Sequence, residues 1–159
     1  MRKLSVWLVS LVFMAGTLFV TLAIAGGSAT KDECIAMCKA AAKMLEQNRD
    51  AAIHEIANPQ GKFVWKDSYV FLMDKNGKML AHPFQGQLVK KDSLFKDTDY
   101  NYANPKKIFV EFVNVAFQKG QGWVDYKWLK EGGSSPSNKL TFIMRVGSTD
   151  MLVGAGTYR

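Results

Sequence analysis

Apolar residues follow two different periods along this chain, and the change of period separates a helical region from a sheet region. Between residues 31 and 57 they recur at intervals of three and four, as in an amphipathic helix. The stripe consists of Ile35, Cys38, Ala42 and Leu45, with Ala52, Ile53 and Ile56 further on. Thr30 and Glu33 have the spacing of a capping box, which starts a helix. The pattern predicts a long N-terminal helix that is broken near Asn48.

After residue 65 the apolar period becomes two, which is typical of strands. Five strands are predicted, at residues 69–73, 79–82, 122–128, 139–146 and 151–158. Asp74 to Gly77 reads as a hairpin turn, because an Asn-Gly pair tolerates the positive φ of a tight turn. A second helix is expected to start at Asn104, with Pro105 in its first position, and to end at Gly120.

The order of elements is helix, two strands, helix, three strands. Because neighbouring strands joined by hairpins pair antiparallel, this order predicts an α+β fold. We expect a long N-terminal helix packed on a largely antiparallel five-stranded sheet, with one further helix.

The first 25 residues have the features of an export signal. Arg2 and Lys3 are basic, residues 4–25 carry no charge, and Ala23 and Ala25 are the small residues that a signal peptidase accepts. The sequence therefore predicts a signal peptide over residues 1–25 and one periplasmic domain over residues 26–159. The alternative is an uncleaved inner-membrane anchor, since the apolar run is long enough to cross a bilayer.

Composition and charge narrow the function further. The chain has 159 residues and a formal charge of +7, and residues 26–159 keep a charge of +5 because the signal contains two basic residues. The charges are scattered, which favours a solvated surface over a nucleic-acid partner. Two cysteines and two histidines are too few for a thiolate zinc site or a histidine-rich metal centre. With no hydrolase, metalloprotease or phosphate-loop motif, no enzyme activity, cofactor or metal is predicted.

Several segments in order resemble the single Cache domain, a PAS-like extracytoplasmic sensor domain. They cover the chain from about Lys31 to Arg159. The segments are Phe63-Val64-Trp65 running into 66–71, Asp74-x-x-Gly77, Ala81-His82-Pro83, residues 120–128, residues 145–150 and residues 154–158. The sequence departs from the family pattern at Leu129-Lys130-Glu131-Gly132, at Val146 to Met151, and at Val89-Lys90-Lys91. These departures border the expected pocket and concern ligand identity more than fold.

The resemblance implies a sensor that binds a small organic acid and acts in signal transduction. No segment after Ala25 is long and apolar enough to span a membrane, so we expect a standalone domain that is read by a membrane-bound signalling partner. A different class of function stays open. The apolar stripe of the N-terminal helix would also suit a structural or interaction protein that forms a homodimer without any ligand.

Strand alternation places candidate ligand-binding side chains on facing positions. Tyr126 and Trp128 share a face of one predicted strand, Arg145 lies on a face of the next, and Tyr69 lies in the first. If these faces coincide, they line a cavity with His82 at its rim. The guanidinium of Arg145 would then hold a carboxylate.

Each of these residues also has a purely structural interpretation. Arg145 could form a salt bridge with Asp125 or Asp150. The two aromatic side chains could simply pack in the core. His82 could be a strand-end residue that hydrogen-bonds to the backbone.

Cys34 and Cys38 lie one helical turn apart. An oxidising compartment favours a disulfide, but the helical spacing would require distortion of the turn. A local disulfide, a disulfide between two chains and a pair of free buried thiols all remain open.

The export signal gives the first testable prediction. The mature protein should begin at Gly26 and should be recovered in the soluble periplasmic fraction, because Ala23 and Ala25 form a cleavage site. Intact-mass measurement checks the N-terminus, and cell fractionation checks the location. Retention of residues 1–25 on a membrane-bound protein would contradict cleavage and support the anchor.

Overall fold

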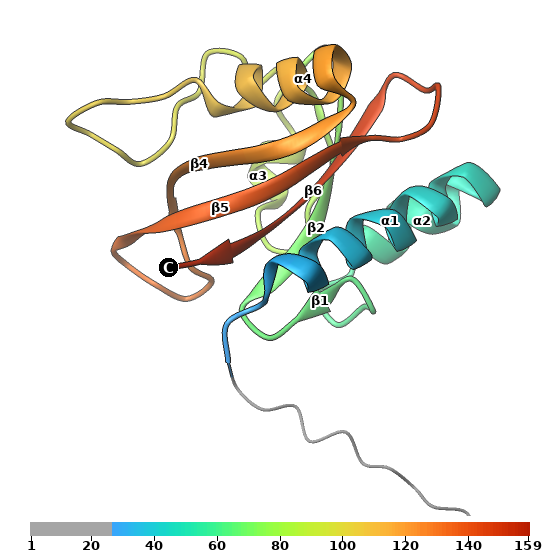
Figure 1. Ribbon diagram of the computed structural model, residues 1–159, viewed down its shortest axis with the longest axis horizontal. Helices are drawn as coiled ribbons and strands as arrows, with labels where there is room; N and C mark the ends of the chain where they lie inside the picture. Colours follow the sequence, from blue (N-terminus) through green and yellow to red (C-terminus); the bar gives the residue numbers. More distant parts are fainter. Residues whose placement is uncertain (1–26) are drawn as a thin grey trace, which may run out of the picture.

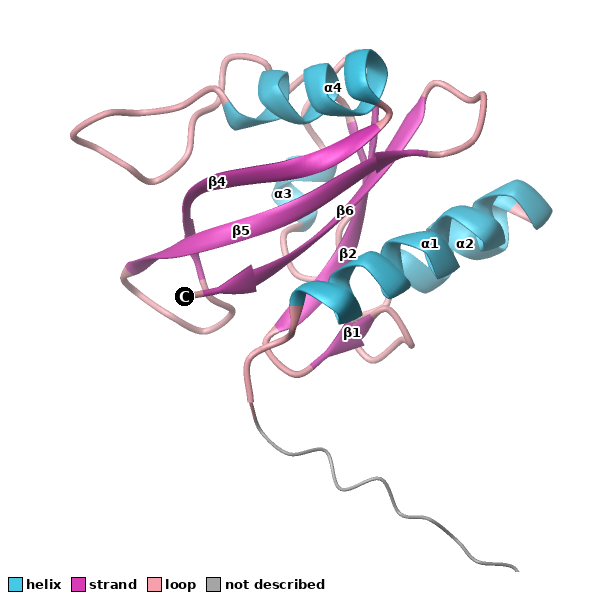
Figure 2. Cartoon of the chain, viewed as in Figure 1, coloured by secondary structure: helices cyan, strands magenta, loops and turns pink. Residues whose placement is uncertain are grey.

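The computed structural model describes residues 27–159, so the predicted signal peptide lies outside the described residues. One antiparallel sheet forms the centre of the molecule, and helices lie on both of its faces (Figures 1 and 2). The predicted α+β class is confirmed.

The sheet has six strands, one more than predicted. They are β1 (Val64–Trp65), β2 (Ser68–Asp74), β3 (Met79–Ala81), β4 (Gln121–Leu129), β5 (Pro136–Arg145) and β6 (Met151–Tyr158). The extra strand β1 is only two residues long and pairs with the start of β2, where a period of two cannot be recognised. The strand order is β1-β2-β6-β5-β4, with β3 also paired to β2. The last strand in sequence therefore lies at the centre, between β2 and β5.

The N-terminal helix is broken at Asn48, as the pattern predicts. Helix α1 (Lys31–Gln47) starts at the capping box of Thr30 and Glu33. Asn48 ends α1, and its side chain accepts a hydrogen bond from Ala51 N to start α2 (Arg49–Ala57). The apolar stripe of α1 is buried against the sheet, chiefly against β6 and β5. Among residues 27–159, no helix combines the length and the apolar character needed to cross a bilayer.

The opposite face of the sheet is covered by α4 (Ile108–Lys119) and by the short helix α3 (Gly86–Val89), which the sequence analysis did not anticipate. Helix α4 begins at Ile108 rather than at Pro105, so the predicted start is corrected. The reason is Asp99, whose backbone and side chain hydrogen-bond to Lys106 O and Lys106 N. These bonds hold residues 104–107 in a loop beside β4. Gly120, with φ of 80°, ends the helix as expected.

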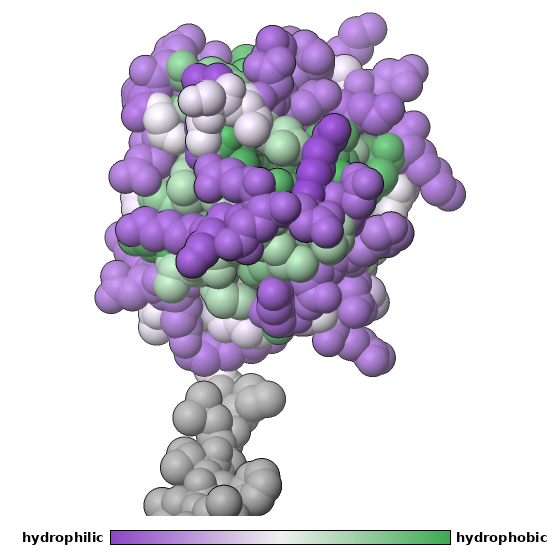
Figure 3. Space-filling view, turned by 90° about the vertical axis from the view of Figure 1, so that its right-hand side faces the viewer, coloured by the Kyte–Doolittle hydropathy of each residue, from purple (hydrophilic) through white to green (hydrophobic). Residues whose placement is uncertain are grey.

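Hydrophilic side chains cover most of the face shown in Figure 3, with apolar area between them. Inside, the sheet separates two apolar cores, one beneath α1 and one beneath α4. Every residue of β6 is buried, because this central strand has helices on both sides. Gly154 and Gly156 of β6 leave room for side chains of the neighbouring strands on the α4 side.

Gly154 provides a test of this packing. A Cβ at Gly154 would collide with the ring of Phe71 and with the side chain of Ile143, both buried. Gly154→Ala should therefore lower the free energy of unfolding by about 1–3 kcal/mol through overpacking. Gly86→Ala is the control, because a Cβ there meets nothing within 4 Å. Denaturant unfolding measures both variants, and equal stability of the two would contradict the packing argument.

Candidate functional site

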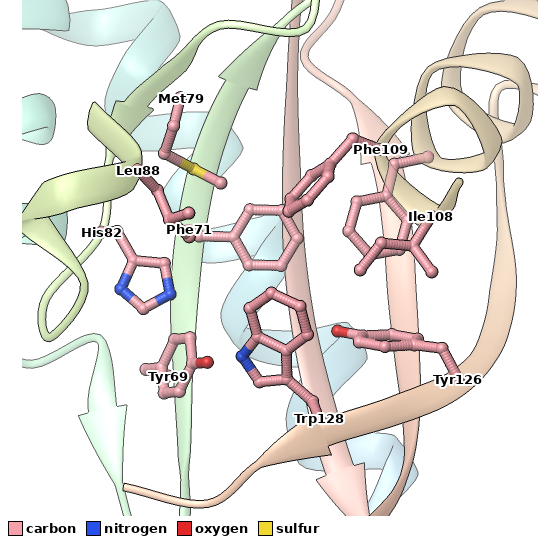
Figure 4. A pocket seen from close by; sticks show the side chains of 10 residues that line it. Tyr69, Phe71, Met79, His82, Leu88, Ile108, Phe109, Tyr126 and Trp128 are labelled. Carbon is pink, nitrogen blue, oxygen red and sulfur yellow. The ribbon is translucent and has the colours of Figure 1, made fainter. Parts of the chain in front are cut away.

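A small cavity lies in the core between the sheet and α4 (Figure 4). Its solvent-accessible volume is about 10 Å³, close to the space that one water molecule needs. The lining side chains come from β2, β3, the α3 region, α4 and β4. They are Tyr69, Phe71, Met79, His82, Leu88, Ile108, Phe109, Phe112, Tyr126 and Trp128.

Four of the five predicted binding residues meet at this cavity: Tyr69, His82, Tyr126 and Trp128. The rings of Tyr69 and His82 are 4.7 Å apart, and those of Tyr126 and Trp128 are 5.9 Å apart. Tyr126 Oη hydrogen-bonds to Thr141 Oγ1 at 2.9 Å. These aromatic side chains pack in the core and also form the wall of a cavity.

His82 has a defined hydrogen-bonding state. Its Nδ1 accepts hydrogen bonds from Phe84 N at 3.2 Å and from Gln85 N at 3.0 Å. Because Nδ1 is an acceptor, the ring proton of the neutral imidazole is on Nε2. Burial lowers the pKa of His82 to about 3, and the charge of Lys139 acts in the same direction. His82 is thus a neutral side chain with an Nε2–H donor, held by the backbone bonds that its structural interpretation anticipated.

The structure places Arg145 elsewhere. Its Nε donates to Thr149 O at 2.9 Å and its guanidinium lies 4.9 Å from the ring centre of Phe117. It shares a strand face with Thr141, but it lies at the far end of β5, where the tight turn to β6 supplies backbone acceptors. Neither predicted partner carboxylate is needed, since Arg145 is held by carbonyl groups and Asp150 pairs with Lys75.

A buried cation, Lys139, contacts the cavity wall through Tyr69, and it was not among the predicted binding residues. Its side chain is buried, with only 2% of the residue exposed. Lys139 Nζ donates to Tyr69 Oη at 3.1 Å and lies 4.2 Å and 4.7 Å from the ring centres of Tyr69 and Tyr158. Its register partner across β5 and β4 is Tyr126. The alternation of the predicted strand does place Lys139 on the face of Thr141, but it places Arg145 on the same face and does not choose between them.

The surroundings of Lys139 make its charge costly. No carboxylate within residues 27–159 forms a salt bridge with it. Burial lowers the pKa of Lys139 to about 7, although Cys34 and Asp67 act in the opposite direction. A buried ammonium without an anionic partner is unusual, because its desolvation is not offset by an ion pair.

Cys34 and Cys38 are free thiols, both buried under the sheet and not joined by a disulfide. Cys38 Sγ lies 3.9 Å from Phe142 O. Burial raises the pKa of Cys34 to about 11 and that of Cys38 well above its ordinary value. Because thiolates are the reactive form, neither sulfur is poised for reaction.

Comparisons with known proteins show what this chain is similar to. The family model of the Cache domain matches residues 32–159. The methyl-accepting chemotaxis protein McpP of Pseudomonas putida is 33% identical over 93 residues, which are 58% of this chain and 16% of that protein. The sensor histidine kinase MctS of Rhizobium johnstonii is 29% identical over 93 residues, 58% of this chain and 19% of that protein. The match thus spans less than a fifth of either relative.

Solved structures share the fold. A Cache chemosensory domain solved for its carboxylic acid recognition superposes with a TM-score of 0.68 at 23% identity, covering 80% of this chain and 91% of that one. The periplasmic sensor domain of a chemotaxis protein gives 0.61 at 26% identity, covering 78% and 86%. A methyl-accepting chemotaxis protein from Vibrio parahaemolyticus gives 0.64 at 19% identity, covering 80% and 87%.

The pKa of Lys139 predicts how stability depends on pH. Between about pH 7 and pH 10.5 the unfolded chain holds a proton that the folded protein has lost, so the free energy of unfolding rises with pH across this window. Below pH 7 Lys139 is charged in the folded protein, and the desolvation of this buried charge lowers the free energy of unfolding by its full amount. Lys139→Met should therefore be more stable than the parent at pH 6, and this advantage should shrink by about 2–5 kcal/mol toward pH 10.

Thermal and denaturant unfolding across this range measure the effect. The matched control is Lys127→Met, because Lys127 is an exposed lysine on β4. The free energy of unfolding of Lys127→Met should differ from that of the parent by the same amount at every pH. A Lys139→Met variant that also shows a constant difference would contradict a lowered pKa of Lys139.

Proposed function

This chain belongs to the Cache domain family, and from that premise we propose that it is a periplasmic sensor domain that binds a small organic acid in the cavity beneath α4. The acid binds as its carboxylate. The buried ammonium of Lys139 is the observation that carries the proposal, because an anionic ligand supplies the partner that the described part of the chain does not.

The polar atoms around the cavity suit an anion. His82 offers Nε2–H, and within residues 27–159 no acceptor takes that hydrogen. Tyr69 Oη accepts from Lys139, and the Tyr69 hydroxyl is also within hydrogen-bonding reach of the Tyr158 hydroxyl and the Trp128 indole. Figure 4 shows the indole nitrogen of Trp128 on the side of Tyr69. Donors to a carboxylate are therefore gathered at one end, and none of the lining side chains is acidic.

In this proposal the charge and the hydrogen bonds come from different residues. His82 donates its Nε2–H to a carboxylate oxygen, and Lys139 stands behind Tyr69 as the cation that favours the charged ligand. The aromatic walls of Phe71 and Phe112 contact its carbon atoms. The accessible space is that of about one water molecule, so even a short acid requires the wall of the cavity to move outward when it binds.

Signalling requires a partner protein that distinguishes the ligand-bound domain from the free domain. Two relatives that match this chain are named as a methyl-accepting chemotaxis protein and a sensor histidine kinase. We therefore assign the domain a binding rather than an enzymatic role, read by a membrane-bound signalling partner outside the cytoplasm.

The test is calorimetric binding of acetate and propionate at pH 6. Lys139→Met should weaken binding by about 10- to 150-fold, the value of a charge-assisted interaction of about 1.5–3 kcal/mol. Affinity of the parent should also fall between pH 6 and pH 8.5 as Lys139 loses its proton, and Lys139→Met should not show this fall.

Arg145→Ala is the matched control, because it removes a cation from the same strand but not from the cavity. It should leave the affinity unchanged. Loss of binding in Arg145→Ala with full binding in Lys139→Met would reverse the assignment and restore the carboxylate contact that the sequence suggested. Failure of the parent protein to bind any short organic acid would overturn the proposed function.

A further inference from the structure

The cavity is lined by residues that solvent barely reaches. All ten lining residues are at most 8% exposed. A second, larger space lies outside it, with a solvent-accessible volume of about 370 Å³, and is called the outer groove here. Its wall includes Lys96, Tyr100 and Tyr102 of the loop before α4, and Tyr102 is 80% exposed. The outer groove is therefore reached directly from solvent.

The cavity and the outer groove are separated by a thin wall. Three residues line both spaces: Leu88 of α3, Phe109 of α4 and Trp128 of β4. Resting on the proposed function, we propose that the outer groove is the entrance to the ligand cavity and that Leu88 is the side chain that opens it.

Two of the three wall residues are held firmly. The ring of Trp128 lies edge-on to Tyr100, Phe109 and Tyr126, with ring centres 4.9 to 6.1 Å apart. Phe109 also packs edge-on to Phe112 within α4 at 5.8 Å. Moving either ring would disturb several aromatic contacts at once.

Leu88 is held less firmly. It belongs to the four-residue helix α3, which has no side-chain cap, and at 8% it is the most exposed residue of the cavity wall. It is followed by the segment 90–107, which contains no helix or strand. Short helices in long loops open at low cost in free energy compared with a packed sheet. Leu88 is therefore the side chain that can leave the wall most easily.

Helix α3 is also tied to the ligand-binding end of the cavity. The two backbone N–H groups that His82 Nδ1 accepts belong to Phe84 and to Gln85, the residue that precedes α3. A ligand that binds Nε2 of the same imidazole would fix this turn. The ligand would thus pass Leu88 and then bind His82, and both residues belong to the same short segment of the chain.

Exchange of the Trp128 indole proton with solvent tests the entrance without any ligand. Measured by NMR on the purified protein, this exchange should become about tenfold faster in Leu88→Ala and moderately faster in the milder Leu88→Val, because each lowers the cost of opening the wall. The indole proton of Trp65, whose Nε1 is buried without a partner under the other face, is the internal reference and should not change.

Leu94→Ala is the matched control. Leu94 lies in the same loop region, is fully buried and lines neither space. It should leave the exchange of Trp128 unchanged. Equal acceleration in Leu94→Ala would mean that the loop is loosened in general, and an unchanged rate in both Leu88 variants would place the entrance elsewhere. Either result would overturn the proposal.

A second experiment uses the ligand. Rapid mixing with propionate, followed by tryptophan fluorescence, measures its association and dissociation rates. Leu88→Ala should raise both the association rate and the dissociation rate, because a gate lowers the barrier that entry and exit share. A change confined to the dissociation rate would make Leu88 a wall contact instead. If the parent protein does not bind propionate, the proposed function fails, and the indole exchange still decides the entrance.

Discussion

The ammonium of Lys139 lies inside the protein between the rings of Tyr69 and Tyr158, and its burial constrains everything around it. Removing a charge from water costs several kcal/mol unless a partner replaces the hydration. Here the replacements within residues 27–159 are one phenol oxygen and two aromatic faces, which attract a cation but do not neutralise it. The ammonium thus has no anionic partner within residues 27–159. A carboxylate of a bound ligand is the simplest group that would supply one.

The rest of the fold keeps that charge in place. Lys139 lies at the paired part of β5, with β4 on one side and β6 on the other, so its backbone cannot shift without breaking both ladders. Gly156 of β6 leaves the space that the side chains of Lys139 and Thr141 occupy. Helices α1 and α4 close the two faces and exclude water. The same packing that makes the charge of Lys139 costly also fixes the position of its side chain.

Much of this arrangement could be predicted from the sequence, because periodicity reports which face of an element is buried. It located α1, its break at Asn48 and the five longer strands, and it brought Tyr69, His82, Tyr126 and Trp128 to one cavity. It could not distinguish Lys139 from Arg145, since both share one face of β5 and only the sheet register shows which end meets the cavity. The start of α4 depended on the hydrogen bonds between Asp99 and Lys106, and Asp99 is held in turn by Lys127 N of β4, a contact that only the folded sheet provides.

The central claim is that Lys139 supplies the charge that a carboxylate ligand meets, and one measurement tests it most directly. The pKa of Lys139 can be followed by nitrogen-15 NMR of its side chain, without ligand and with saturating propionate. A bound carboxylate favours the protonated amine, so the account predicts that the pKa rises from about 7 toward its ordinary value. A pKa of Lys139 that is unchanged in the bound protein would contradict it.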